Sequence, residues 1–315
     1  MTIASATAAH AEGKSTTASG NSSHAEGDTT RATAAASHAE GLSTFASGSM
    51  AHTEGSSTKA TATASHAEGY MTQASGFCAH AEGRNTTANG WSSHTEGYKT
   101  IASATAAHAE GYYATATGFA VHAEGMNVIA SVTAAHAEGY NTQAIGMAAH
   151  AEGNSTKASG NYSHAEGNWT EASGNYSHAE GNATLASGNC SHAEGSLTIA
   201  NSESQHVFGA WNIADSNTYT TTRGNYIEIV GNGTSQVNRS NARTLDWNGN
   251  EWLAGTLIVG AAPTTAMHVA TKKYVDDIII NKISMPASAT NGDFLVYNGS
   301  TWVAQSLSVW NGGNY

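Results

Sequence analysis

Residues 1–209 repeat one 14-residue sequence without insertion or deletion, and this period constrains the fold more than any other feature. Histidine recurs every 14 residues from His10 to His206, fifteen times in all. A glutamate follows two residues later in the first fourteen copies, and a glycine follows three residues later in every copy. Such a short and strict period is typical of solenoids, in which each repeat is one turn stacked on the next.

Each repeat has two halves of seven residues, Ser-His-Ala-Glu-Gly-x-x and Thr-x-Ala-Ser-Gly-x-x. Five residues alternate in each half, and two turn residues follow. Because successive side chains of a strand face opposite sides, we expect the small residues Ser163, Ala165 and Gly167 to face inward. His164 and Glu166 then face outward. The pattern predicts an all-β fold, a two-sided parallel β-roll whose turns lie ~4.8 Å apart in a rod of roughly 65–70 Å.

The outward histidines and glutamates form two rows, which we call the His/Glu ladder. The repeat glutamates are fourteen of the 24 acidic residues and account for most of the net charge of −12. Carboxylates stacked at ~4.8 Å repel by on the order of 3 kcal/mol per neighbouring pair, so they need a partner. Histidine is the available partner, and a nearby carboxylate is expected to raise its pKa. We expect a hydrogen-bond network within and between chains, formed by His24, Glu26, His38, Glu40, His66, Glu68, His108, Glu110, His164, Glu166, His178 and Glu180 and their repeats.

Three other interpretations of the ladder remain open. A metal array is considered because His and Glu ligate zinc and similar ions, although the spacing fits no known closed site. An ice-binding face is disfavoured because the regular threonine is on the inward side. Catalytic carboxylates are disfavoured because acid–base pairs need two different environments, whereas an unbroken array gives every glutamate the same one. The sequence therefore predicts no catalytic, cofactor-binding or metal-binding residues, no cofactor and no enzyme activity.

Several classes of protein are disfavoured by composition. Charged residues are only 11% and prolines only 2, unlike most disordered chains. There is no basic run, so we expect no nucleic-acid partner. There is no apolar run of about 18 residues and no signal peptide, so neither membrane insertion nor ordinary secretion is expected. Cys78 and Cys190 lie eight repeats apart, too far for an intrachain disulfide.

The repeat pattern breaks after His206, where Phe208 replaces the glutamate as a capping turn would. We expect residues 210–262 to form a β-rich connector. Its strongest signals are a strand at residues 226–230 and a hairpin turn at Asn248-Gly249.

The remaining residues are expected to form two further segments. Apolar residues four apart predict one helix within 263–285, which in three copies would form a short coiled coil. Two β-like runs around Asn298-Gly299 predict a hairpin within 286–315. The candidate tip contacts are Trp302, Trp310 and Tyr315.

The repeat resembles the head repeats of trimeric autotransporter adhesins (YadA-like), in which a 14-residue Ser-x-Ala-x-Gly sequence builds a left-handed parallel β-roll. The resemblance covers residues 1–209 and implies that three rolls pack about an axis, with the x positions facing the trimer core. Those positions are often aliphatic in that family, whereas here they are His and Glu. It therefore implies that the His/Glu ladder lies at a trimer axis.

The closer likeness is to phage and prophage tail-fibre proteins that carry His-Ala-Glu-Gly arrays. Residues 242–250 and 267–275 resemble recurring segments of such fibres. This likeness implies a homotrimeric structural fibre located in the virion tail, with a β-roll shaft, a β connector, a short trimeric helix and a β-hairpin tip. Its partners would be other tail or baseplate proteins and a host cell-surface receptor, with glycans as one receptor class.

Two alternatives are kept. The first is a trimeric adhesin on the bacterial cell surface, built on the same shaft. The second is a fibre-borne glycan depolymerase. The array is already in register at Thr2, which suggests either a piece of a longer fibre or a shaft that docks directly on another protein.

Overall fold

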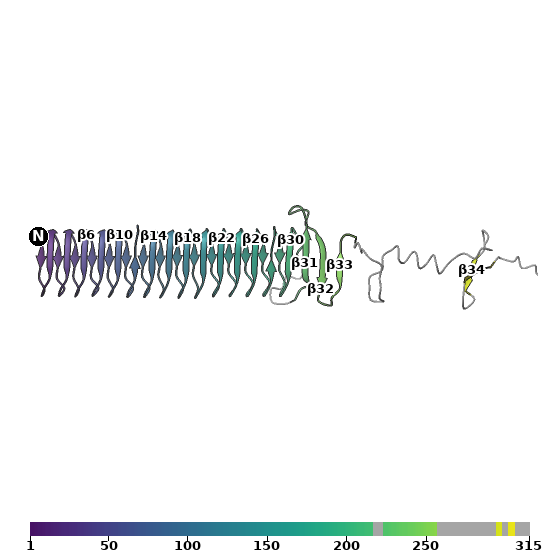
Figure 1. The fold of residues 1–315 in the computed structure, drawn as a ribbon, viewed down its shortest axis with the longest axis horizontal. Helices are drawn as coiled ribbons and strands as arrows, with labels where there is room; N and C mark the ends of the chain where they lie inside the picture. Colours follow the sequence, from purple (N-terminus) through teal and green to yellow (C-terminus); the bar gives the residue numbers. More distant parts are fainter. Residues whose placement is uncertain (217–222, 257–293, 298–301, 306–315) are drawn as a thin grey trace, which may run out of the picture. The chain divides into compact units, whose positions relative to one another are not determined.

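The computed structural model describes residues 1–216, 223–256, 294–297 and 302–305. It divides into two units, Met1–Ala254 and Gly255–Tyr315. The first unit contains a parallel β-solenoid whose turns are stacked along the repeat array (Figure 1). The predicted all-β roll with 14-residue turns is therefore confirmed.

The first half of each turn contributes a long strand, of five residues in all turns but two, and the second half contributes a short strand of two residues, so the two halves of the repeat are not equivalent. The expectation of five strand residues in each half was wrong for the second half, where only two residues pair. The long-strand sheet consists of β2 (His10–Lys14), β4 (His24–Asp28), β6 (His38–Leu42), β8 (His52–Ser56), β10 (His66–Tyr70), β12 (His80–Ala81), β14 (His94–Tyr98), β16 (His108–Tyr112), β18 (His122–Met126), β20 (His136–Tyr140), β22 (His150–Asn154), β24 (His164–Asn168), β26 (His178–Asn182), β28 (His192–Ala193) and β30 (His206–Ala210).

The short strands form a second parallel sheet of fifteen strands. They are β1 (Ile3–Ala4), β3 (Thr17–Ala18), β5 (Arg31–Ala32), β7 (Phe45–Ala46), β9 (Lys59–Ala60), β11 (Gln73–Ala74), β13 (Thr87–Ala88), β15 (Ile101–Ala102), β17 (Thr115–Ala116), β19 (Ile129–Ala130), β21 (Gln143–Ala144), β23 (Lys157–Ala158), β25 (Glu171–Ala172), β27 (Leu185–Ala186) and β29 (Ile199–Ala200).

The register of both sheets follows the 14-residue period. In the long-strand sheet, His164 pairs with His150 on one side and with His178 on the other. In the short-strand sheet, Ala172 pairs in the same way with its counterparts 14 residues away. Every residue is therefore stacked on the same position of the next turn, which is why the sequence repeats without an insertion.

The interior between the two sheets is narrow and is filled by small side chains. Ala165 and Ala172 are 0% exposed, and Ser163 and Thr170 are 2% and 1% exposed. Gly167 was expected to face inward with them, but it is exposed. Its φ is +106°, and a Cβ there would lie 2.3 Å from the carbonyl oxygen of Gly181. The repeat glycine is needed because the backbones of neighbouring turns approach closely there. Packing of the interior is not the reason.

The turns between strands hold one left-handed residue every seven positions. Examples are Trp169 and Tyr176, each with a φ of 58°. These residues are not glycines, so each turn carries some backbone strain, which the hydrogen bonds of the stack must offset. Their side chains project from the solenoid, with exposed fractions of 66% for Trp169 and 62% for Tyr176. Other aromatic residues of the array, such as Tyr98, Tyr112 and Tyr140, are instead the last residues of long strands.

The long-strand sheet continues by one more parallel strand after β30, the strand that contains Phe208. Strand β31 (Tyr226–Asn232) pairs in parallel with β30, aligning His206 with Glu228. Strand β32 (Asn241–Asp246) then runs antiparallel to β31, and β33 (Glu251–Leu253) runs antiparallel to β32. Phe208 is therefore an ordinary strand residue, and the expected capping turn at that position is not observed. The predicted strand near 226–230 and the predicted hairpin turn at Asn248-Gly249 are both confirmed, and Gly249 has a φ of 81°.

The last short strand is closed by a side chain. In the array, the amide of Leu185 donates to the carbonyl oxygen of Thr198 on the next turn. At the last turn, the buried Asn212 occupies the threonine position. Its Oδ1 accepts from the amide of Ile199 at 2.8 Å, and its Nδ2 donates to the carbonyl of Ile199 at 3.0 Å. One asparagine side chain thus replaces the missing rung of the short-strand sheet.

In the second unit, β34 (Phe294–Tyr297) pairs antiparallel with β35 (Trp302–Gln305), as the hairpin pattern predicts. The candidate tip contact Trp302 is the first residue of β35. The helix expected within 263–285 and the candidate tip contacts Trp310 and Tyr315 lie outside the described residues. Within the part of the chain that is described, no helix has the length and apolar character needed to cross a bilayer.

Candidate functional site: the His/Glu ladder

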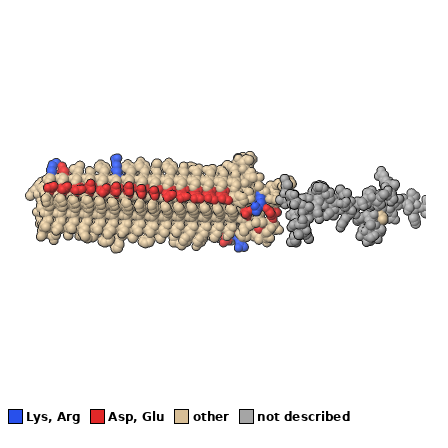
Figure 2. Space-filling view, viewed as in Figure 1, with Lys and Arg blue, Asp and Glu red and all other residues tan. Residues whose placement is uncertain are grey.

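The His/Glu ladder lies on the outer face of the long-strand sheet, as predicted. Its glutamates form one continuous acidic stripe along the solenoid (Figure 2). The twelve ladder residues named from the sequence all belong to this face, because each lies at the first or third position of a long strand. Consecutive histidine rings, from His10 to His206, have their centroids 4.7 to 4.9 Å apart. This spacing confirms the turn separation expected for stacked strands.

The histidine–glutamate contacts change partner along the ladder. From His10 to His164, the contacts shorter than 4 Å join Nε2 to the glutamate of the same turn, for example at 3.4 Å between His66 and Glu68. Glu166 is 3.8 Å from both His164 and His178. After it, the contacts cross between turns, as between His192 and Glu180 at 3.4 Å. The ladder can therefore connect within a turn or between turns with little movement of the side chains.

The expected hydrogen-bond network is largely absent in the single chain. His122 Nε2 is within hydrogen-bonding geometry of Glu124 at 3.3 Å. Thirteen other ladder histidines have an Nε2 atom that solvent cannot reach and that has no hydrogen-bond partner among the described residues. Contacts of 3.4 to 3.8 Å between nitrogen and oxygen are too long for good hydrogen bonds. The Nε2 atoms are thus close to carboxylates without being satisfied by them.

The expected rise in the histidine pKa is contradicted where a shift is resolved. Burial lowers the pKa of His66, His108 and His136, and the neighbouring histidine rings lower it further. The carboxylates act in the opposite direction but are outweighed. Sequence reasoning counted the glutamate partner and overlooked that stacking also places like groups above and below each ring.

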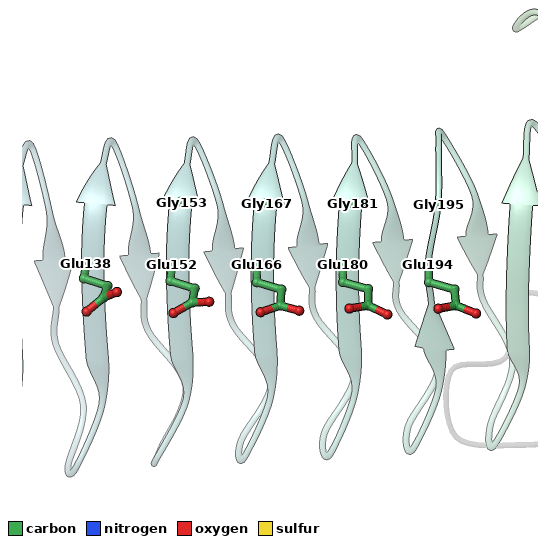
Figure 3. A pocket seen from close by; sticks show the side chains of 9 residues that line it. All are labelled: Glu138, Glu152, Gly153, Glu166, Gly167, Glu180, Gly181, Glu194 and Gly195. Atoms are coloured by element: carbon green, nitrogen blue, oxygen red, sulfur yellow. The ribbon is translucent and has the colours of Figure 1, made fainter.

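A shallow groove of about 580 Å³ follows the glutamates near the end of the array. It is lined by the carboxylates from Glu138 to Glu194, which Figure 3 shows in one row along the turns, and by the repeat glycines from Gly153 to Gly195. The glycines leave the carboxylates accessible from one side because they have no side chain. The groove is therefore an open channel lined by acidic groups at regular spacing.

Ligand atoms from neighbouring turns come together along the ladder, an arrangement that the linear spacing did not suggest. Five sets of three side chains have their nitrogen and oxygen atoms within 4.8 Å of one another, and stacking of the turns brings each set together. They are His38/Glu40/His52, His66/Glu68/His80, Glu152/His164/Glu166, Glu166/His178/Glu180 and Glu180/His192/Glu194.

A second surface feature runs along the turns that follow the long strands. The guanidinium of Arg84 lies between the rings of Tyr70 and Tyr98, 5.6 Å from each centroid. Lys99 donates to the hydroxyl of Tyr113 at 2.8 Å, and this hydrogen bond raises the pKa of the lysine. Stacked cations and aromatic rings of this kind give an exposed edge with both apolar and polar character.

The connector has its own hollow of about 550 Å³. Tyr226, Asp246 and Trp252 are among its lining residues, and Trp252 is 56% exposed. The carboxylate of Asp246 accepts hydrogen bonds from Asn248 and Asn250, which lowers its pKa. The hollow therefore combines an aromatic side chain with an ionised carboxylate.

These features define the class of protein as a histidine-rich β-solenoid of about 15 turns with 14-residue repeats. No protein-family model matches the chain, and no curated protein matches it as a relative.

Proposed function

We propose that this chain forms the shaft of a homotrimeric attachment fibre in a phage tail, with the His/Glu ladder of each copy facing the trimer axis. The observation that carries the proposal is the uniformity of this face. The position seven residues after each histidine varies freely, from Arg31 and Phe45 to Leu185, whereas the ladder changes only at its final turn. A face that is constant over fourteen turns meets the same surroundings at every turn, and a parallel second and third copy provide such surroundings.

The geometry of a single chain supports this arrangement. From His24 to His206, the histidine and glutamate side chains that contact each other are 29 to 51% exposed. They are therefore neither buried nor fully solvated. Their Nε2 atoms have unused hydrogen-bonding capacity. The exposed parts of the rings and carboxylates would meet those of neighbouring copies at the same 14-residue register.

Attachment to a host surface would use the exposed turns and the residues beyond the array. The aromatic turn residues include Trp91, Trp169 and Tyr176, which are 62 to 66% exposed. Aromatic side chains at surfaces are favourable contacts for the apolar faces of sugars and for proteins. The alternative of a bacterial surface adhesin would use the same shaft and the same turns.

The experiment is a measurement of native mass by light scattering at pH 8 and at pH 4.5. We expect three times the chain mass of 32.2 kDa at pH 8. Dissociation at only one pH would show which protonation state of the ladder the assembly needs. A monomeric mass at both values would contradict the proposal.

Two double variants with reversed charges test whether the ladder is the interface. Glu166→Arg with Glu180→Arg inserts two long cations into the proposed axis and should lower the measured mass. Glu171→Arg with Glu203→Arg makes the same charge change away from the ladder and should leave the mass unchanged. Equal behaviour of the two variants would mean that the ladder is not the interface.

The virion assignment is tested separately by immunogold labelling of phage particles from the source strain. Label at the tail supports a fibre, whereas label on the bacterial envelope alone supports the adhesin. Incubation with host-surface glycans, followed by measurement of their chain length, tests the depolymerase alternative, and we expect no shortening.

A further inference from the structure

The ladder between Glu152 and Glu194 contains three overlapping sets of metal-type ligands, each with one histidine and two glutamates. Glu166 and Glu180 are each shared by two sets, so only the two outer sets have no ligand in common. Their carboxylates also line the acidic groove, which leaves a side open for water.

One nitrogen–oxygen separation in each outer set is closer to that of a tetrahedral zinc site than to a hydrogen bond. Two ligands held at about 2.0–2.1 Å from a tetrahedral zinc ion lie roughly 3.3 Å from each other. Nε2 of His164 is 3.8 Å from Glu166, and Nε2 of His192 is 3.4 Å from Glu180. Both Nε2 atoms are inaccessible to solvent and have no hydrogen-bond partner in the part of the chain that the structure describes. A cation between nitrogen and oxygen would satisfy both atoms at close to the observed separation.

Charge balance indicates how many of these sets are filled. The three sets contain four carboxylates, Glu152, Glu166, Glu180 and Glu194. Two divalent cations neutralise four carboxylates, and two neighbouring cations about 4.8 Å apart would repel each other. Filling the two outer sets and leaving the middle one empty satisfies both conditions.

We propose that the His/Glu ladder binds divalent cations of the zinc class, one at Glu152/His164/Glu166 and one at Glu180/His192/Glu194, with water completing each coordination shell. The sets His38/Glu40/His52 and His66/Glu68/His80, each with two histidines and one glutamate, hold one cation each. Imidazole with carboxylate suits zinc, whereas magnesium and calcium prefer oxygen ligands alone. Every ligand of a set comes from one chain, so this proposal does not depend on the trimer or on attachment.

The experiment measures bound zinc in the full chain, prepared without a histidine tag and freed of metal by chelation. The protein is equilibrated with micromolar ZnCl₂ and desalted, and zinc per chain is determined by atomic emission. We expect about four zinc ions per chain, from the four separate three-ligand sets. A tenfold excess of MgCl₂ should not displace them.

Two matched variants locate the sites. Glu166→Gln with Glu180→Gln removes one carboxylate from each outer set and should lower the zinc content by about two ions per chain. Glu171→Gln with Glu203→Gln makes the same charge change off the ladder and should leave the zinc content unchanged. Less than one zinc per chain in the unmodified protein, or the same zinc content in both variants, would overturn the proposal.

Zinc-edge X-ray absorption of the unmodified protein gives an answer that does not depend on the folding of a variant. A nitrogen and oxygen shell at ~2.0–2.1 Å with imidazole scattering is expected. A shell of oxygen alone would overturn the proposal. A monomeric native mass would contradict the proposed fibre and would leave the expected zinc content unchanged.

Discussion

The inward threonine places a buried hydroxyl group in the core of each repeat that carries it. Thr170 is 1% exposed, and its hydroxyl has no hydrogen-bond partner among the described residues. The same inward position holds Ala114 and Val128 in two other turns, both 0% exposed. The interior therefore accepts an apolar side chain of this size, and the unpaired hydroxyl carries a desolvation cost.

We predict that Thr170→Val raises the free energy of unfolding by roughly 1 kcal/mol, because it removes an unpaired polar atom at nearly constant volume. The measurement is urea unfolding followed by circular dichroism. Ser177→Ala is the contrasting variant, because the Ser177 hydroxyl donates to the carbonyl of Gly174 at 2.6 Å. It should destabilise by about 1 kcal/mol. Destabilisation by Thr170→Val would mean that the hydroxyl is satisfied in solution.

The ladder histidines predict the pH dependence of stability. The pKa values of His66, His108 and His136 are lowered from a usual value of 6.5 by burial and by neighbouring rings. The unfolded chain therefore takes up protons first, so the stability contributed by these groups is complete above pH 6.5 and is lost as the pH falls below it.

We expect the midpoint temperature of thermal unfolding, measured in chelator-containing buffer, to be lower at pH 5 than at pH 7.5. In the triple variant with His66, His108 and His136 each changed to Gln, the midpoint should depend less on pH. A midpoint that rises on acidification would instead support the protonated His–Glu network expected from the sequence.

At the scale of the element, the two sheets end differently. The long-strand sheet is extended by β31, which adds a parallel rung, and then by the antiparallel strands β32 and β33. Among the described residues the short-strand sheet has no such extension at β29, and the side chain of Asn212 takes its place. An unprotected strand edge is a template for further pairing, so this asparagine protects the end of the array.

We predict that Asn212→Ala destabilises the last turns by about 1–3 kcal/mol, because it leaves the amide and carbonyl of Ile199 without partners. Hydrogen exchange of the Ile199 amide is the direct measurement and should become faster. Asn168→Ala is the control, because Asn168 bonds to Asn182 on the exposed surface. Unchanged exchange at Ile199 in the Asn212 variant would show that another group closes the edge.

At the scale of the whole array, each turn contacts only the turns before and after it, so stability should be nearly additive over turns. Hydrogen bonds between turns and stacked ladder residues repeat with the same 14-residue register throughout. Removing one complete turn should then leave all remaining contacts intact.

We predict that deletion of residues 164–177 leaves a folded protein with a rod shorter by ~4.8 Å, measured by small-angle scattering. Deletion of residues 164–170 removes only half a turn and places the next long strand over a short-strand position. This variant should lose cooperative unfolding. Equal tolerance of the two deletions would contradict the assigned turn length.

Local alternation in the sequence was sufficient for much of this structure. It predicted the 14-residue turn, the inward Ser163, Ala165 and Thr170, and the outward His and Glu, because the direction of a strand side chain depends only on its position. The hairpin turn at Asn248-Gly249 was equally predictable, since the dipeptide itself favours that backbone conformation.

Contacts between turns decided the rest. Stacking set the backbone approach that requires Gly167, the like neighbours that lower the pKa of His66, and the cross-turn contact of His192 with Glu180. It also brought together the three-ligand sets, in each of which a His–Glu pair of one turn meets a residue 12 and 14 positions away on the neighbouring turn. One repeat read alone contains none of these contacts, because each of them forms only when a second turn lies against the first.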